Sequence, residues 1–231
     1  MTIELRGKWA LVTGSSRGVG VQIARGLARH GCNLVLHSRQ QSGTAALARE
    51  LGAQVRVIAL AAELSDQSAV DHLAEEAQQA SGGIDVLYNN AAIMTAYRSE
   101  IATVTAEDYR RSFEVNVIAP IRLTFALLPS MLRKKFGRII QITSGIKEEP
   151  ELMAYAASKA ALDKFVRDMA PRLRGTGVTM NLVDPGWLRT DLGGPKAPNP
   201  VESVLPGALV PALAGDELHG QLIRAQDHAA R

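Results

Sequence analysis

Short apolar runs alternate with segments of helical periodicity along most of this chain, and this alternation is the feature that most restricts its fold. Two apolar strands separated by a helix run parallel, because a parallel pair needs a crossover connection. Strands that are apolar on both faces need helices on both faces. The pattern predicts an α/β fold, a doubly wound parallel sheet that is Rossmann-like, with three layers and six to seven strands. The predicted strands are 8–13, 34–36, 54–60, 84–88, 138–143 and 178–183, with a last short one at 220–225.

Helical spacing fills the intervals between these runs. Ser65 is the expected N-cap of the third helix, and Thr105 to Asp108 has the form of a capping box at the start of a long helix. Pro120 is expected to kink that helix. The predicted helices lie at 18–31, near 42–51, and at 66–80, 105–135, 155–173 and 201–213.

Length and composition limit the classes of protein to consider. A chain of 231 residues fits one domain, and we expect residues 1–231 to form a single domain. Only 4% of the residues are aromatic, and the 26 basic and 23 acidic residues are well mixed. No basic stripe or stacking surface is present, so nucleic-acid binding is not expected.

The location expected from the sequence is the cytoplasm. Cys32 is the only cysteine, so no internal disulfide can form. The first eight residues lack an apolar signal-peptide core, and no stretch approaches 18 consecutive apolar residues, so we expect no membrane span. The five histidines are scattered without metal-ligand spacing, so no metal is expected.

The first strand ends in a glycine-rich turn, Gly14-Ser-Ser-Arg-Gly18-Val-Gly20. Glycines there let the backbone turn tightly and approach a ligand, and the free amides of the following helix favour a pyrophosphate. The turn therefore predicts dinucleotide binding, with Ser16, Arg17 and Val19 beside the glycines. A tight strand-to-helix turn without a ligand is the alternative.

The second strand should end near the adenosine ribose of a dinucleotide. An acidic residue there would favour NAD, but this chain has Ser38 and Arg39, with Arg17 nearby in the glycine turn. Two guanidinium groups and a hydroxyl suit a 2′-phosphate, so we predict NADP(H). The alternative is that both arginines are simply solvated.

Tyr155 and Lys159 lie one turn apart on the same face of a predicted helix. A phenol is a poor acid or base near neutrality, and a neighbouring ammonium favours the phenolate and lowers its pKa. The pair suits proton transfer. Taken alone, the spacing also fits a Tyr and a Lys that merely share a helix face.

Six motifs occur together, in an order and spacing that resemble the classical short-chain dehydrogenase/reductase family. The resemblance runs from about residue 7 to residue 191. The motifs are Thr13-Gly14-xxx-Gly18-x-Gly20, Asn89-Asn90-Ala91, Asn116, Ser144, Tyr155-xxx-Lys159 and Pro185-Gly186.

The resemblance implies a role for each of four residues. Tyr155 would be the general acid in carbonyl reduction and the base in alcohol oxidation. Lys159 would lower the pKa of Tyr155 and hydrogen-bond the nicotinamide ribose. Ser144 would donate a hydrogen bond to the substrate oxygen, and Asn116 would hold a water in a proton relay to Lys159.

The resemblance also implies further cofactor contacts. Asn90 and Ala91 would line the adenosine and the central sheet, and Glu63 with Leu64 would lie near the adenine ring. Pro185, Gly186, Leu188 and Thr190 would face the nicotinamide. Hydride chemistry would come from the cofactor, and the side chains would supply position and the proton.

The chain departs from the family pattern at three places. Ala92 stands where the family usually has Gly, which we expect to be tolerated. The loop between Ser144 and Tyr155 is two residues shorter than usual and carries Glu148, Glu149 and Glu151, charges that either select a polar or cationic substrate or are simply solvated. The segment 192–200 is also short, which implies an open pocket with Trp187 as a wall.

These observations predict an enzyme, an NADP-dependent short-chain dehydrogenase/reductase that transfers a hydride between NADP(H) and a small-molecule carbonyl or alcohol. Residues 1–231 would form its single Rossmann-like dinucleotide-binding and catalytic domain, with a short substrate-side segment near 187–213. The resemblance implies a homodimer or homotetramer joined through the helices that start near Thr105 and Tyr155. The alternatives are a non-catalytic dinucleotide-binding regulator, or an epimerase or dehydratase on the same fold. Substrate identity does not follow from the sequence.

Overall fold

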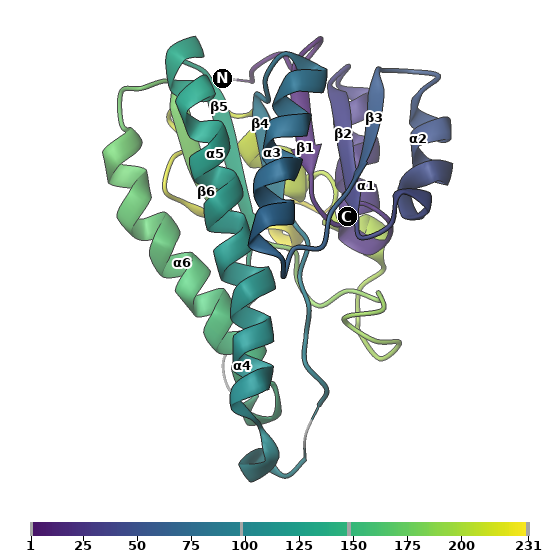
Figure 1. The fold of residues 1–231 in the computed structure, drawn as a ribbon, viewed down its shortest axis with the longest axis vertical. Coiled ribbons are helices and arrows are strands. Elements are labelled where there is room, and N and C mark those ends of the chain that lie inside the picture. The colour runs from purple at the N-terminus through teal and green to yellow at the C-terminus, as the bar shows by residue number, and fades with distance from the viewer. Residues whose placement is uncertain (1, 98, 147–148, 230–231) are drawn as a thin grey trace.

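Seven parallel strands form one sheet in the computed structural model, which describes residues 2–97, 99–146 and 149–229 (Figure 1). Their order is β3-β2-β1-β4-β5-β6-β7, so the order reverses between β1 and β4. The predicted doubly wound parallel sheet is confirmed. The strands are β1 (Trp9–Val12), β2 (Asn33–Ser38), β3 (Val57–Ala61), β4 (Val86–Asn89), β5 (Gly137–Ile142), β6 (Val178–Asp184) and β7 (Leu222–Arg224).

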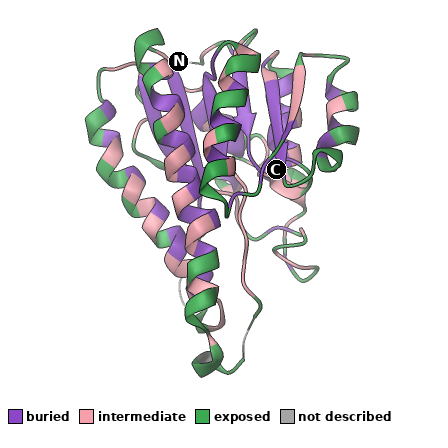
Figure 2. Cartoon of the chain, viewed as in Figure 1, coloured by how far each residue is buried: buried purple, intermediate pink, exposed green. Residues whose placement is uncertain are grey.

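Helices cover both faces of the sheet and bury two apolar clusters against it (Figure 2). On one face lie α1 (Gly18–Arg29), α2 (Ala45–Leu51) and α7 (Val210–Leu213), with Ile23 and Leu27 of α1 in the core. The other face carries α3 (Gln67–Ser81), α5 (Ala119–Lys134) and α6 (Met153–Leu173). α4 (Ala106–Phe113) continues the line of α5 beyond the sheet (Figure 1). Because both faces are covered, the strands are buried and ligands have access at the sheet edges.

Most predicted helices differ from the structure by a few residues at one or both ends, and two of the differences have a clear physical reason. The N-cap of α3 is Asp66 rather than Ser65, because the Asp66 carboxylate accepts hydrogen bonds from the N–H groups of Ser68 and Ala69. The single helix predicted over 201–213 is wrong. Pro206 lacks an N–H and disfavours helical backbone at the residue before it, and Leu205 is extended. Only 3₁₀ turns at Val201–Val204 and Gly207–Leu209 and the short α7 form there.

The long helix predicted from Thr105 is confirmed at its start and interrupted in its middle. Thr105 and Asp108 form the reciprocal capping box. The segment Glu114–Ile118 is a π-helix that joins α4 to α5, and Pro120 follows it in the first turn of α5. A wider turn of this kind is characteristic of functional sites. It carries Asn116, which is completely buried.

The same helical stretch, 106–134, is long and apolar enough to cross a membrane by length and composition alone. More than half of its most apolar window, 56%, is buried inside the protein. A core helix meets the same criterion, so the stretch is weak evidence for a membrane span.

Candidate active site

A cavity of about 710 Å³ opens at the carboxyl edge of the sheet, where the strand order reverses between β1 and β4. This is the position at which open α/β sheets bind ligands. The glycine turn and the ends of β2 and β4 line one part, while β5, α6 and the segment after β6 line another. Of the predicted cofactor residues, the cavity is lined by Gly14, Ser16, Arg17, Gly18, Val19, Ser38, Arg39, Glu63, Leu64, Asn90, Ala91, Tyr155, Lys159, Pro185 and Thr190.

The glycine turn is held against the end of β4 by hydrogen bonds and by close packing. Asn90 Nδ2 donates to the carbonyl oxygen of Thr13 at 2.8 Å, and Thr13 Oγ1 accepts from the N–H groups of Asn90 and Ala91. Gly14 has a φ of +66°, and a Cβ there would lie 2.8 Å from the Ala91 Cα. A Cβ on Gly20 would lie 2.4 Å from the carbonyl oxygen of Gly14. Glycine is therefore required at both positions for the turn to hold this shape.

His37 at the end of β2 supports the same turn, although the sequence predicted no role for it. Its Nδ1 accepts a hydrogen bond from the Gly14 N–H at 3.2 Å, and its Nε2 lies 3.1 Å from the carbonyl oxygen of Ala62. Burial lowers the pKa of His37, while the Ala62 carbonyl and Glu63 act in the opposite direction. The neutral imidazole, with Nε2 as donor, fits both contacts. Only its place at the end of the second strand gives a signal in the sequence.

The two predicted phosphate-binding arginines are exposed at the rim of the cavity. Arg17 Nη1 forms an ion pair with Asp191 Oδ2 at 3.2 Å, and both side chains are largely solvated. Such an exposed pair contributes little stability and is easily exchanged for another anion. The Ser38 hydroxyl instead donates to the carbonyl oxygen of Gln40 at 2.5 Å. Both arginines therefore line the cavity with exposed side chains, whereas the Ser38 hydroxyl is bonded within a turn.

Tyr155 and Lys159 lie on α6 with both side chains buried at the cavity. Burial raises the pKa of Tyr155 to about 12, a hydrogen bond with the Ser144 side chain acts in the opposite direction, and the charge of Asp184 raises it further. Lys159 Nζ donates to the carbonyl oxygen of Ile142 at 2.7 Å and lies 5.7 Å from the centroid of the Tyr155 ring. Burial is the largest influence on this pKa, and Lys159 is not among the groups that shift it in this structure, so the predicted lowering by Lys159 stays a prediction.

Burial also changes the pKa of Lys159, which falls to about 8. The negative charge of Asp163, one turn further along α6, acts in the opposite direction. The buried ammonium thus loses its proton near the pH at which enzymes work, whereas an exposed lysine remains charged there.

The Asn116 side chain makes three hydrogen bonds to other protein groups. Its Oδ1 accepts from the Ile93 N–H, and its Nδ2 donates to the carbonyl oxygen of Ile93 at 2.9 Å and to Ser158 Oγ at 3.0 Å. Ser158 in turn donates to the carbonyl oxygen of Tyr155. Asn116 therefore links the loop after β4 to the first turns of α6. Its predicted contact with a water stays a prediction.

Several predicted residues do not line the cavity. Asn116 and Ser144 lie beside it, and Gly20 lies beneath the glycine turn. The side chain of Leu188 is 4% exposed and packs in the core, and Gly186 lies against Gln226. Trp187 was expected to form a wall, but its indole is 58% exposed and donates to the carbonyl oxygen of Gly193. Residues that line the cavity without a signal in the sequence include Ile93, Met94, Arg111 and Leu192.

The departures from the family pattern have local explanations. Among the described residues other than glycine, only Lys135 has a positive φ, so Ala92 is tolerated without strain. The carboxylate of Glu151 raises the pKa of the exposed Tyr97. The acidic loop therefore lies beside the segment after β4, which carries Tyr97. Glu148, predicted to belong to that loop, lies outside the described residues.

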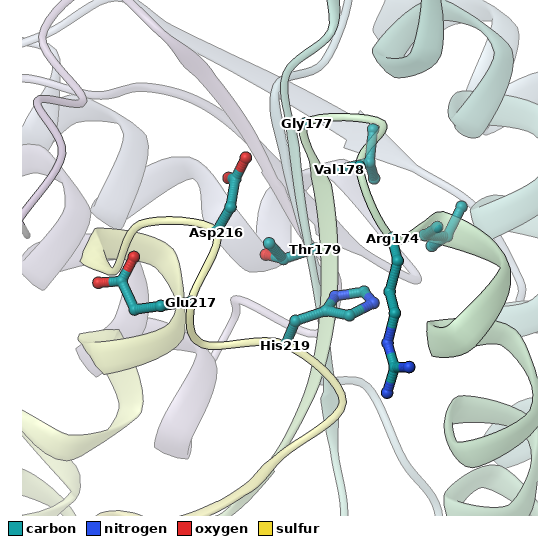
Figure 3. Close-up of a pocket in the computed structure, with 9 residues that line it drawn as sticks. Arg174, Gly177, Val178, Thr179, Asp216, Glu217 and His219 are labelled. Atoms are coloured by element: carbon teal, nitrogen blue, oxygen red, sulfur yellow. The ribbon is translucent and has the colours of Figure 1, made fainter.

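A second cavity, of about 320 Å³, lies at the opposite, amino edge of β6 (Figure 3). Two of the polar side chains that line it bond to other parts of the protein. His219 Nδ1 accepts from the Met180 N–H, His219 Nε2 lies 2.6 Å from the carbonyl oxygen of Ala170, and Asp216 pairs with the buried Arg138. It is therefore not the candidate active site. In the described part of the chain, no three His, Cys, Asp or Glu residues are grouped to hold a metal ion.

Comparison with known families gives a match to the model described as short chain dehydrogenase, over residues 8–200. Among curated proteins, the ketoacyl reductase HetN of Nostoc is 38% identical over 187 residues, which are 80% of this chain and 64% of that protein. The 3-oxoacyl-(acyl-carrier-protein) reductase FabG of Escherichia coli is 32% identical over 192 residues, 82% of this chain and 77% of that protein. The chain spans 63% and 64% of the length of two of the curated relatives that it matches.

Solved structures extend the likeness to nearly the whole chain. A blue fluorescent protein from a metagenomic library, in complex with NADPH, is 33% identical with a TM-score of 0.83, covering 96% of this chain and 97% of that one. A 3-oxoacyl (acyl-carrier-protein) reductase from Agrobacterium tumefaciens, with NADP bound, is 29% identical with a TM-score of 0.83, covering 95% of this chain and 93% of that one.

Proposed function

The chain belongs to the short-chain dehydrogenase/reductase family, and we propose that it is an NADP(H)-dependent oxidoreductase that interconverts a carbonyl compound and the corresponding alcohol. The observation that carries this proposal is the buried Tyr155 phenol at the cavity, hydrogen-bonded to Ser144 and one turn from the Lys159 ammonium. A protein that only binds a dinucleotide does not need this set. The four-residue assignment of Asn116, Ser144, Tyr155 and Lys159 to catalysis is part of the proposal.

The residues around the cavity fit NADP(H). A Cβ at Gly14 or Gly20 would collide with backbone, so the glycine turn keeps the shape that a pyrophosphate requires. Arg17 and Arg39 lie at the rim near the end of β2, where a 2′-phosphate would be held. Relatives of known structure were crystallised with NADPH or NADP. When bound, the cofactor supplies or accepts the hydride.

The proton chemistry is assigned to this chain's own groups. With a pKa of about 12, the Tyr155 phenol is protonated at neutral pH, which suits donation of a proton in the direction of carbonyl reduction. Ser144 donates a hydrogen bond to the substrate oxygen and stabilises the negative charge that develops there. Lys159 holds a positive charge beside the phenol, and Asn116 positions the start of α6 through Ser158.

Substitution of Tyr155 by Phe tests the mechanism. Oxidation of NADPH, and separately of NADH, is followed with a panel of aldehydes and ketones, and cofactor binding is measured directly. Tyr155→Phe should lower kcat by about 10²–10⁴-fold, the usual contribution of a general acid, with little change in the Kd for NADPH. Tyr109→Phe, outside the cavity, is the matched control and should keep its turnover. NADPH should be preferred over NADH.

Other results would support the alternatives. Unchanged turnover in Tyr155→Phe would refute the mechanism. Tight NADPH binding by the wild type with no turnover of any carbonyl or alcohol would indicate a regulator. Product formation without net consumption of cofactor would indicate an epimerase or dehydratase.

We also propose that residues 1–231 act as one domain that assembles into a homodimer or homotetramer in the cytoplasm. α5 and α6 support this proposal with an exposed apolar face. Phe125 is 49% exposed and Leu132 is 38% exposed, and the Phe125 ring packs edge-on against Phe165 of α6 at 5.8 Å between centroids. Large apolar side chains gathered on adjacent helices are typical of interaction surfaces.

A further inference from the structure

Two side chains on α6 hold consecutive residues at the end of β5. Lys159 Nζ donates to the carbonyl oxygen of Ile142 at 2.7 Å, and Asp163 Oδ1 accepts from Thr143 Oγ1 at 2.5 Å. Asp163 is four residues after Lys159, so both side chains leave the same face of the helix. The next residue of the chain is Ser144. The two contacts therefore set where Ser144 lies relative to Tyr155.

Asp163 also bears on the charge of Lys159. The carboxylate is half-buried, and the charged groups that act on it are Lys159 and Arg167 on its own helix and Asp184 at the end of β6. Burial is the largest influence and raises the pKa of Asp163, with Asp184 acting in the same direction, whereas the hydrogen bond from Thr143 and the two cations oppose the rise. A hydroxyl that donates to this oxygen favours the ionised carboxylate.

We propose that Asp163 is a positioning residue for the reaction proposed above: its carboxylate holds Thr143, and through it Ser144, against α6 and keeps the neighbouring Lys159 positively charged. This inference rests on the proposed function. Asp163 is not among the residues that line the cavity, so it acts through Thr143 and Lys159. Its loss should therefore change the placement of Ser144 and the pH at which Lys159 loses its proton.

The pH dependence has a definite sign. Burial lowers the pKa of Lys159 to about 8, and Asp163 opposes that shift. Removal of the negative charge should lower the pKa of Lys159 further. The charged form would then be lost at a lower pH, and carbonyl reduction should decline at a lower pH than in the wild type.

The test uses Asp163→Asn with Asp168→Asn as its matched control, because Asp168 lies on the same helix in an exposed pair with Lys164. Thermal melting establishes that each variant is folded. The titration of Lys159 is measured by NMR on lysine labelled with ¹³C at Cε, with Lys159→Arg to assign the signal. In Asp163→Asn the midpoint should move to lower pH, and the alkaline limb of kcat/KM should move with it, while Asp168→Asn behaves as the wild type.

Thr143 supplies a second, independent pair of variants. Thr143→Val should lower kcat by about tenfold to a hundredfold, since a small misplacement of a catalytic group has costs of this size, and Thr143→Ser should restore it. If Asp163→Asn does not fold, the two Thr143 variants test the proposal in its place. A wild-type Lys159 titration and alkaline limb in folded Asp163→Asn, or full kcat in Thr143→Val, would overturn the proposal. The NMR titration needs no substrate, so absence of turnover in the wild type would count against the proposed function alone.

Discussion

At the scale of single residues, the site is built from polar side chains whose hydrogen-bonding groups are committed to the protein. The Asn116 amide bonds Ile93 and Ser158, and the His37 ring bonds Gly14 and Ala62. Buried polar groups without partners are costly, so each of these contacts restrains the loop that it reaches. The positions of these loops are thereby fixed by contacts within the protein.

His37 should make both stability and cofactor binding sensitive to acid. Burial lowers its pKa in the folded protein from 6.5, so below that pH the unfolded chain takes up the proton more readily, and stability falls as the pH falls. Protonation also removes the acceptor for the Gly14 N–H. Both quantities, the free energy of unfolding and the Kd for NADPH, are measured from pH 8 to pH 5. Below about pH 6.5 the free energy of unfolding should fall and the Kd for NADPH should rise.

His37→Gln should remove part of this pH dependence, because glutamine does not titrate. His30→Gln is the control, since His30 is exposed after α1. Identical pH profiles for the wild type and His37→Gln would show that the contact with the glycine turn is not the cause.

At the scale of elements, the segment from α4 to α5 places the residues that meet α6. The capping box starts α4, the π-helix turns Asn116 toward Ile93, and α5 packs in the core through Leu123 and Leu127. α6 carries Tyr155 and Lys159 at its buried start. The site therefore depends on how α6 packs beside the continuous line of α4 and α5 (Figure 1).

Loss of the capping box should destabilise α4. Thr105 Oγ1 accepts from the Asp108 N–H, and the Asp108 carboxylate accepts from the Thr105 N–H. Thr105→Ala should lower the free energy of unfolding by about 1 kcal/mol, as measured by urea denaturation. Thr105→Ser keeps a hydroxyl and should retain most of the stability. Equal stability of the two variants would mean that the cap contributes nothing measurable.

At the scale of the whole molecule, the sheet separates two kinds of surface. The carboxyl edge holds the cavity, and the outer face of α5 and α6 presents Phe125 and Leu132 to solvent. Burying that face against a second copy would remove apolar area from water without blocking the cavity residues.

Assembly should therefore be disrupted by a charge on that face. Light scattering with size exclusion should give a dimer or tetramer for the wild type at micromolar concentration and a smaller species for Phe125→Glu. Arg29→Glu, at the exposed end of α1 on the other side of the sheet, is the control and should assemble normally. A monomeric wild type would contradict the proposal.

The sequence by itself determined the class of the fold and indicated the residues of the candidate site. Strand and helix periods are local properties of the chain, and so are the glycine turn after β1 and the four-residue spacing of Tyr155 and Lys159. Because parallel strands end at one edge, these local signals also predicted which loops would meet.

Only the tertiary structure decided the contacts between distant segments. The contact of His37 with Gly14, the contact of Asp163 with Thr143 and the burial of Leu188 all depend on neighbours that spacing along the chain does not specify. The pKa of Tyr155 could not be predicted from spacing along the chain either. Lys159 was visible in the sequence, but the burial that raises the pKa of Tyr155 arises from packing at the sheet edge.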